Sequence, residues 1–331
     1  MQKQKGALSA LLAAGLLLLT GCGAGGARNT GNKTDKLRIV CSVFPEYDWT
    51  KQILGSHAEE VELHYILESG ADLHSFQPTM DDMMQISDCD LFLYVGGESD
   101  AWTADAIAGA VNPEMRTLAL LDVLGDAAVT EEVKEGMQAE DEAEEAEDGE
   151  EAPEYDEHVW LSLRRAKTVC GEITDQLCQL DSAHADDYRA NFAAYAKKLD
   201  ALDQDFQTLT DSAVQKTLLF GDRFPFRYFT EDYGLDYYAA FVGCSAETEA
   251  SFETVVFLAN KVDALGLDTV YTIESSDGAI ARTIIENTRD KNQQIAVLNS
   301  IQSVTGQQIQ DGTTYLSLMQ QNYDVLKAHL Q

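Results

Sequence analysis

One long helical pattern in the middle of the sequence limits the architectures open to the rest of the chain. Between Ala183 and Leu209, large apolar residues recur at alternating steps of four and three: Tyr188, Phe192, Tyr195, Leu199, Leu202, Phe206 and Leu209. This spacing places them on one face of a helix about 40 Å long, at about 1.5 Å per residue. A coiled-coil dimer could use such a face. With only about four heptads, flanked by α/β patterns, a helical spine within one chain fits better.

Strand-like and helical patterns alternate on both sides of this helix. Strands are predicted before it at residues 37–43, 61–67, 91–95 and 117–121, and after it at 217–220, 236–242, 269–273 and 294–298. Helices are predicted between them, including 46–54, one capped by Thr79, and 163–180. This alternation predicts an α/β fold of two Rossmann-like lobes, residues 37–182 and 212–331, joined by a long rigid helix at 183–211.

The first 22 residues predict an export signal that ends in a lipid anchor. A basic start precedes the apolar run Ala7–Leu19, which is too short to span a bilayer but suits a secretory signal. Leu19-Thr-Gly-Cys22 resembles the bacterial lipobox, whose cysteine is lipidated. The alternative is a plain signal peptide with a chance cysteine. Residues 23–36 predict a flexible tether. We therefore expect an extracytoplasmic protein anchored to the cell membrane through Cys22.

The charge of the chain excludes one class of partner. A formal charge of −34 argues against nucleic acid, because the phosphate backbone would repel the protein. Residues 131–157 hold fifteen Asp or Glu and one Lys. Such a segment supplies no apolar core, so we expect a disordered acidic loop there. It could loosely concentrate cations, although a solvated loop is the simpler interpretation.

The cysteines beyond Cys22 are five in number and irregularly spaced: Cys41, Cys89, Cys170, Cys178 and Cys244. They form no CxxC motif, so the sequence indicates neither a zinc knuckle nor a disulfide framework. We expect them to be buried free thiols.

Four potential metal ligands stand where predicted strands end, the edge at which α/β sheets bind ligands. His74 comes after the strand ending near Leu67, and His158 follows the acidic loop. Asp222 ends the stretch Leu-Leu-Phe-Gly-Asp, and Glu274 ends Val-Tyr-Thr-Ile-Glu. Each half contributes two of them, so a cleft between the halves could bring them together. Imidazole and carboxylate are ligands for zinc, manganese and iron.

Other interpretations of these residues stay open at this point. His74 could be an ordinary loop histidine, and His158 a structural one beside Trp160. Asp222 and Glu274 could cap helices. Two histidines and a carboxylate could also hold an activated water in a secreted metallohydrolase, although no general base is identifiable.

Several motifs resemble the metal-binding lipoproteins that serve ABC importers of zinc and manganese. His74-Ser-Phe-Gln-Pro is similar to the His-x-Phe/Tyr-Glu/Gln-Pro signature of that family, and His158-Val-Trp-Leu to its second ligand segment. Further matches are Val43-Phe-Pro-Glu-Tyr-Asp-Trp, Ser87-Asp-Cys-Asp-Leu-Phe-Leu-Tyr-Val-Gly-Gly and the C-terminal Tyr315-Leu-Ser-Leu-Met-Gln-Gln-Asn-Tyr. They follow the family order over nearly the whole mature chain. The family fold of two α/β lobes on a rigid helical spine agrees with the pattern above.

The resemblance makes His74 and His158 the first two metal ligands, but the chain departs from the family at the third. There the family has His or Glu in a His-x-x-Phe-Gly-Tyr-Phe segment, and an ungapped alignment places Arg223 at that position. Arginine stays protonated and cannot bind a metal, so Asp222, one residue earlier, is the candidate. Glu274 is the candidate fourth ligand, with Asp277 as a possible additional one. Many zinc members also carry histidines in the acidic loop, and this loop has none.

The resemblance implies a solute-binding lipoprotein rather than an enzyme. Such a protein captures one Zn²⁺ or Mn²⁺ between its lobes and delivers it to the membrane permease of an ABC transporter. A site closed by four protein ligands leaves no position for a reacting water. We expect zinc rather than manganese as the ligand, and a monomer. The sequence is silent on any adhesin role.

Overall fold

The computed structural model describes residues 36–138, 154–245, 247 and 249–330. The predicted leader, its Cys22 and nearly all of the tether lie outside the described residues, as do residues 139–153 of the acidic loop. Everything from Lys36 onward belongs to one unit. In the part of the chain that is described, no helix has the length and apolar character required to cross a membrane.

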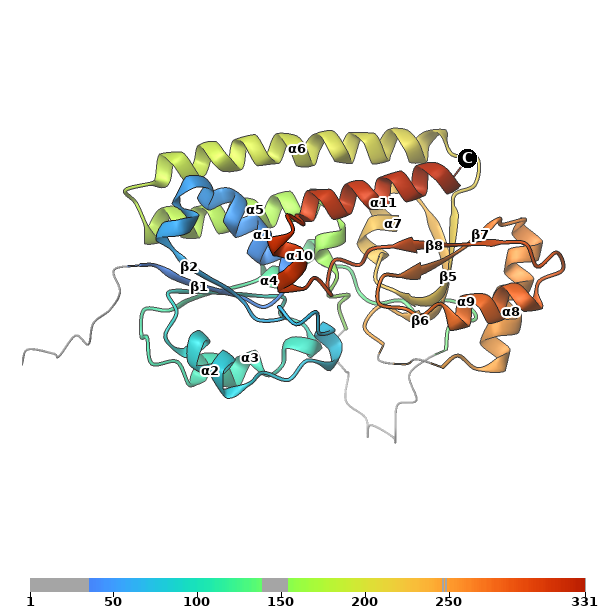
Figure 1. Cartoon of the computed structure of the whole chain (residues 1–331), viewed down its shortest axis with the longest axis horizontal. Coiled ribbons are helices and arrows are strands. Elements are labelled where there is room, and N and C mark those ends of the chain that lie inside the picture. The colour runs from blue at the N-terminus through green and yellow to red at the C-terminus, as the bar shows by residue number, and fades with distance from the viewer. Residues whose placement is uncertain (1–35, 139–153, 246, 248, 331) are drawn as a thin grey trace, which may run out of the picture. The chain divides into compact units, whose positions relative to one another are not determined.

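Two four-stranded parallel sheets form the framework (Figure 1). The first has the order β2-β1-β3-β4, made of β1 (Arg38–Cys41), β2 (Glu62–Tyr65), β3 (Leu91–Tyr94) and β4 (Arg116–Ala119). The second has the order β6-β5-β7-β8, made of β5 (Thr217–Phe224), β6 (Asp236–Val242), β7 (Thr269–Ile273) and β8 (Gln294–Leu298). The predicted α/β class with two lobes is confirmed.

The strand order places a crevice at the same point of both sheets. In each sheet the chain moves from the first strand to one neighbour and later crosses to the opposite side. Ligands of such sheets bind at the carboxyl ends of the strands where this reversal occurs. The loops that follow β1 and β3, and those that follow β5 and β7, are therefore the expected walls of a site.

Helices cover both faces of the first sheet. Those of this half are α1 (Phe44–Leu54), α2 (Met80–Ser87), α3 (Thr103–Ala108), α4 (Leu120–Leu124) and α5 (Leu163–Leu180). In Figure 1, α2 and α3 lie on one side of the sheet, and α1 and α5 on the other. Thr79 caps α2 and is capped in return by Asp82, as the sequence predicts.

The second sheet is covered in the same way. Its helices are α7 (Arg227–Tyr233), α8 (Phe252–Leu265), α9 (Ala279–Asn287), α10 (Gly306–Gln310) and α11 (Tyr315–His329). Helices α8 and α9 share a small apolar core with β5, β6 and β7. Gly266 ends α8 with a φ of 63°, which satisfies the helix terminus at no steric cost. Short 3-10 turns complete the described chain: η1 (Gly55–Glu60), η2 (Leu73–Ser75), η3 (Glu98–Asp100), η4 (Gly125–Ala127) and η5 (Val159–Leu161).

The predicted spine is α6 (Ala185–Ser212), which extends along both sheets in Figure 1. It packs against α1, α5, α7 and α11. The buried part of its stripe is Tyr188, Tyr195, Leu199, Leu202 and Phe206. The stripe is thus covered within the chain, as predicted, and is not left free for a coiled-coil partner.

Buried hydrogen bonds tie the two halves together beside the spine. The indole nitrogen of Trp160 donates to the carbonyl of Ser300 at 2.8 Å, and the Tyr315 hydroxyl donates to the carbonyl of Trp160. The backbone N–H of Tyr315 donates to Asp48 on α1 at 3.0 Å. Because these contacts connect α1 and η5 to the C-terminal half, they fix the walls of any site between the halves.

Strand β5 differs from its prediction in a way that matters for the site. The sequence pattern ends the strand at Phe220, whereas the strand continues to Phe224. Its pairing with β6 is irregular between Phe220 and Arg223, so Asp222 lies in a bulge of the strand rather than in a turn after it.

Candidate metal centre

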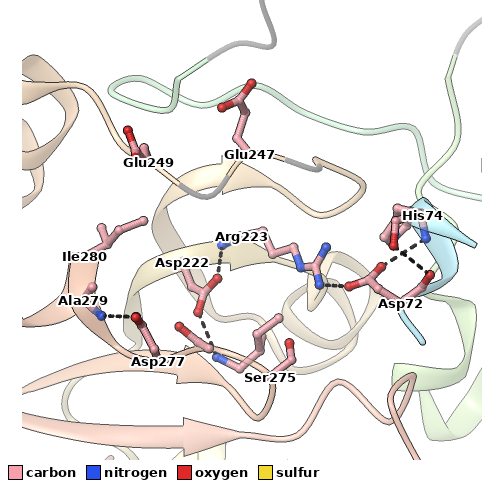
Figure 2. Close-up of a pocket in the computed structure, with 13 residues that line it drawn as sticks. Asp72, His74, Asp222, Arg223, Glu247, Glu249, Ser275, Asp277, Ala279 and Ile280 are labelled. Carbon is pink, nitrogen blue, oxygen red and sulfur yellow. Dashed lines mark hydrogen bonds and ion pairs between the residues drawn. The ribbon is translucent and has the colours of Figure 1, made fainter. Parts of the chain in front are cut away.

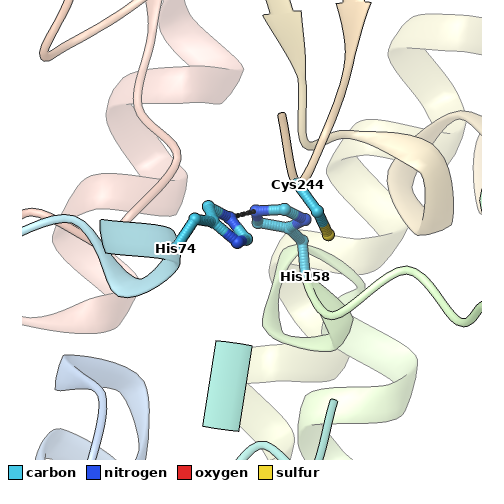
Figure 3. A group of neighbouring side chains, drawn as sticks. All are labelled: His74, His158 and Cys244. Carbon is cyan, nitrogen blue, oxygen red and sulfur yellow. Dashed lines mark hydrogen bonds between the residues drawn. The ribbon is translucent and has the colours of Figure 1, made fainter. Parts of the chain in front are cut away.

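Two histidines from distant parts of the chain meet between the sheets. His74 lies in η2, after β2, and His158 directly precedes η5. Their Nε2 atoms are 3.1 Å apart (Figure 3). The side chain of His74 is 3 % exposed and that of His158 is 0 % exposed. The structure therefore brings together the two histidines that the sequence singled out, and their side chains are almost fully buried.

The same local turn presents both imidazoles. Asp72 precedes His74 by two residues and accepts its backbone N–H at 3.0 Å. Asp156 precedes His158 by two residues and accepts its N–H at 2.8 Å. An aspartate that binds the backbone two residues ahead stabilises a tight turn. The repeated Asp-x-His pattern is visible in the sequence, and it was the signal that sequence reasoning overlooked.

Further polar groups hold the other nitrogen of each ring. His74 Nδ1 lies 2.7 Å from Ser99 Oγ and 3.5 Å from Glu157 Oε2. His158 Nδ1 lies 3.1 Å from Asp156 Oδ1. Partners of this kind fix ring orientation and tautomer in metal-binding histidines, and they leave Nε2 as the donor atom. Both Nε2 lone pairs consequently face the same small space.

Burial and neighbouring charges shift the pKa values of the two rings in opposite directions. Burial lowers the pKa of His74 well below its usual value, and the neighbouring His158 lowers it further. Burial also disfavours a charge on His158, but the surrounding carboxylates of Asp156, Glu157 and Glu131 together outweigh it and raise the pKa of His158. The same carboxylates would favour a cation bound beside the ring.

The spacing of the rings suits a tetrahedral metal. Zn–N bonds of about 2.05 Å at the tetrahedral angle place two nitrogen ligands about 3.3 Å apart. The observed 3.1 Å is close to that distance. Zinc therefore requires only a small movement of the two rings.

The two predicted carboxylate ligands are not directed at the histidines. Asp222 accepts the backbone N–H groups of Arg223 at 2.9 Å and of Ile273 at 3.4 Å. Glu274 accepts both the N–H and the hydroxyl of Ser300, at 2.7 and 2.8 Å. Neither belongs to the group of possible ligand atoms that the described residues place around His74 and His158.

A cleft of about 630 Å³ lies between His74 and Asp222 (Figure 2). His74 lines it from one half of the molecule, while Asp222 and Asp277 line it from the other. Asp277 accepts the N–H of Ala279 at 2.7 Å, at the start of α9. Asp277 thus binds the backbone just before α9, whose N-cap residue is Gly278.

Arg223, at the position where a third ligand was expected, spans the cleft. Its guanidinium forms an ion pair with Asp72, and it donates to the carbonyl of Ser245 at 3.2 Å (Figure 2). Burial lowers the pKa of Arg223, but the group faces a carboxylate in a half-buried site. Arginine therefore contributes an ion pair between the halves in place of a metal–ligand bond.

The third member of the ligand group is Cys244, in the loop after β6. One ligand atom each from His74, His158 and Cys244 lie within 4.8 Å of one another (Figure 3). All five described cysteines are free; four are buried, as expected, and Cys244 is partly exposed. Sequence reasoning missed Cys244 as a candidate, because no spacing motif surrounds it.

The acidic loop requires a correction at its two ends. Asp156 and Glu157 were assigned to a disordered loop, yet each is 2 % exposed and contacts a histidine of the site. At the other end, Glu131 accepts the N–H of Cys244 at 3.0 Å. Contacts with the site histidines and with Cys244 hold these acidic residues in place, although the segment around them is too acidic to form a core. Of the predicted loop 131–157, only residues 139–153 lie outside the described residues.

Comparison with known proteins decides the family. The family model described as "Zinc-uptake complex component A periplasmic", ZnuA, matches residues 39–329. The chain belongs to the ZnuA family. The resemblance stated from the motifs is therefore confirmed. This family consists of components of metal-uptake systems and not of hydrolases, which removes the support for a metallohydrolase.

Individual relatives of the ZnuA family give the same picture. The high-affinity zinc uptake system protein ZnuA of Bacillus subtilis is 28 % identical over 321 residues, which is 97 % of this chain and 96 % of that protein. The zinc-binding lipoprotein AdcA of Streptococcus pneumoniae serotype 4 is 29 % identical over 292 residues. That match covers 88 % of this chain and 55 % of AdcA. The chain thus spans about half the length of the AdcA proteins that it matches.

Solved structures confirm the fold. The Zn(II)-bound ZnuA-like domain of Streptococcus pneumoniae AdcA has a TM-score of 0.68 and 26 % identity, over 89 % of this chain and 99 % of that one. A mutant of the laminin-binding adhesin Lmb of Streptococcus agalactiae has a TM-score of 0.72 at 22 % identity, over 89 % of this chain and 100 % of that one, a likeness of fold alone.

Proposed function

We propose that this protein is the substrate-binding lipoprotein of an ABC importer for zinc. It captures one Zn²⁺ between its two halves and delivers the ion to the membrane permease. The single observation that carries the proposal is the convergence of His74 and His158, with their Nε2 atoms 3.1 Å apart in a buried, polar setting. The zinc names of the relatives support zinc rather than manganese as the ligand.

The remaining features of the proposal come from the sequence. Cys22 carries the lipid anchor, the folded part lies outside the cytoplasmic membrane as a monomer, and residues 23–36 form the tether. His74 and His158 are the nitrogen ligands. The sequence candidates for the rest of the site are Asp222 and Glu274, with Asp277 as a possible addition. Asp222 lies in the bulge of β5, and Glu274 and Asp277 follow β7, so an ion bound to any of them and to the histidines would link the halves.

In this proposal, zinc is released by the movement of loops and not by separation of the two halves. The Trp160–Ser300 and Tyr315–Asp48 hydrogen bonds hold the halves beside the spine. Because the halves are tied, we propose that the loops carrying the ligands of the second half move when the permease takes the ion. The ion pair between Arg223 and Asp72 closes one side of the cleft and is the contact that such a movement has to break.

Uptake of radioactive zinc by whole cells tests this function. Cells that lack the gene should take up zinc more slowly under chelation, and the full chain should restore the parental rate. A His158→Ala chain should fail to restore it. A His64→Ala chain, which changes an exposed histidine on β2, should succeed. Parental uptake in the gene-deleted cells, with no change in growth under chelation, would contradict the proposal.

A further inference from the structure

The candidate donors of the second half that the sequence suggested are already occupied. Both oxygens of Glu274 accept hydrogen bonds from Ser300. The carboxylate of Asp222 accepts two backbone N–H groups in the bulge of β5. Neither carboxylate is grouped with the histidine nitrogens as a possible ligand in the described structure, so each would have to move before it could bind the same metal. Their hydrogen bonds hold both carboxylates in their present positions and oppose such a movement.

Cys244 is placed differently. Among the described residues, it is the residue of the second half whose ligand atom joins those of His74 and His158 within 4.8 Å. Bonds of about 2.3 Å to sulfur and 2.05 Å to nitrogen put these atoms about 3.6 Å apart in a tetrahedral zinc site. Cys244 therefore needs to approach the histidines by about 1 Å at most.

Neighbouring residues hold the backbone of Cys244 at this point. Glu131 accepts its N–H at 3.0 Å, across from the N-terminal half. Gly243, the preceding residue, permits the approach: a Cβ there would lie 2.9 Å from the carbonyl oxygen of Phe224 and 3.2 Å from Cε1 of His158. A side chain at this position would force the backbone at Phe224 to shift, so glycine lets the end of β6 lie close to the His158 ring.

We propose that the thiolate of Cys244 is the third protein ligand of the zinc ion, in the place that Arg223 cannot fill. This proposal rests on the proposed function and names a ligand for the same ion. On binding, a Zn–S bond forms and the thiol proton passes to solvent, so the site becomes N₂S with one negative ligand. The fourth position is left to a carboxylate, with Glu274 as the candidate, or to water.

A thiolate ligand has a consequence for cargo choice. Thiolate is a soft donor that favours zinc, whereas manganese prefers carboxylate, carbonyl and water oxygens. A His₂Cys set therefore discriminates against manganese through ligand type as well as through the general affinity order. Replacing the sulfur by oxygen should reduce the difference between the binding affinities for zinc and manganese.

Cobalt spectroscopy tests the ligand directly. The full chain carrying Cys22→Ser, which removes the tether thiol and the lipid, is reduced and titrated with Co²⁺. We expect a thiolate-to-cobalt charge-transfer band in the near ultraviolet. Cys244→Ser should remove this band while visible bands of histidine-bound cobalt remain. Cys178→Ser changes another thiol, whose sulfur contacts the carbonyl of Ala185, and should keep the band.

Zinc affinity provides the second readout. Cys244→Ser should weaken Zn²⁺ binding by roughly 10- to 100-fold, a range already seen when residues that only hydrogen-bond to a metal ligand are changed. The affinity for Mn²⁺ should change less. If Cys244→Ser keeps both the band and the parental affinity while His158→Ala loses binding, the thiolate proposal is overturned and the proposed function stands. Parental zinc binding by the histidine variants would overturn both.

A measurement on the unaltered cysteine guards against misfolding of the variant. Zn²⁺ should protect Cys244 from alkylation, as located by mass spectrometry of the digested chain. Cys178 should be alkylated to the same extent with and without zinc. Equal labelling of Cys244 in both conditions would contradict ligation.

Discussion

One buried carboxylate, that of Asp100, lies in the loop next to the site. Hydrogen bonds from backbone N–H groups offset part of the free-energy cost of burying it. Asp100, 1 % exposed, accepts the N–H groups of Val95 at 2.6 Å and Gly96 at 3.2 Å. Its other oxygen has no hydrogen-bond partner among the described groups. Burial raises the pKa of Asp100 to about 6. The loop that presents Ser99 to His74 is therefore held by an acid whose ionisation is made less favourable by burial.

The raised pKa predicts a pH dependence of stability. A carboxyl with a folded-state pKa above the unfolded value of 3.8 contributes stability below that value and loses it as the pH rises through about 6. A shift of about 2 units corresponds to roughly 3 kcal/mol. Between pH 4 and pH 7, Asp100→Asn should therefore gain on the order of 3 kcal/mol in unfolding free energy relative to the parent.

Denaturant unfolding at pH 4, 5, 6 and 7 measures this difference. Asp126→Asn, a change at an exposed carboxylate, serves as control and should run parallel to the parent. If Asp100→Asn also runs parallel to the parent at every pH, the pKa of Asp100 is not raised in the fold and the interpretation fails.

The proposed ligands differ in how far the sequence could indicate them. His74 and His158 could be singled out because each stands in a short recognisable motif. The ligand role proposed for Cys244 could not, because it depends on how closely the loop after β6 approaches His158, and only Gly243 hints at that. Asp156 and Glu157 were misassigned because their composition matches the acidic run, while their burial depends on partners far away in sequence.

At the scale of elements, the spine combines the two halves through aromatic packing. Phe206 on α6 is fully buried, and its ring centroid lies 5.0 Å from that of Phe229 on α7 and 5.4 Å from that of Tyr323 on α11. Both partners belong to the C-terminal half. The helix that leaves the first half is thus bound to the second by an edge-to-face cluster.

Removing this ring should destabilise the fold without changing the site. Phe206→Ala leaves a cavity and should lower the unfolding free energy by about 3–5 kcal/mol. Phe252→Ala, which removes a ring that is 76 % exposed, should change it by about 0.5 kcal/mol or less. Urea unfolding compares the two variants. Equal losses for both would show that the spine packing is not what holds α6.

The elements were predictable to the extent that their patterns were long. Parallel strands rich in apolar residues give recognisable runs, so the eight strands of the described chain fall within or overlap their predicted ranges. The short helices α4 and α10 could not be predicted, because five residues complete too few turns to show a period. The extension of β5 beyond Phe220 could not be predicted, because a bulge interrupts the alternation of apolar and polar residues along the strand.

At the scale of the whole molecule, the proposed lipid anchor and the proposed metal site lie in separate parts of the chain. The lipobox and tether precede the first strand, and the proposed ligands all lie beyond residue 70. Cys22→Ala should therefore release the protein from the membrane fraction while leaving zinc binding unchanged. Fractionation of cells followed by immunoblotting checks the release. Retention of the variant in the membrane would contradict the anchor.

The central claim is that one ion is held by two histidines that the fold brings together from both sides of the acidic segment. Titration calorimetry of Zn²⁺ into the full chain and its histidine variants tests it most directly. His74→Ala and His158→Ala should each weaken binding at least ~100-fold, or about 2.7 kcal/mol, and His64→Ala should bind like the parent. The metal-induced rise in Tm should shrink in step. Parental affinity in both site variants would contradict the account.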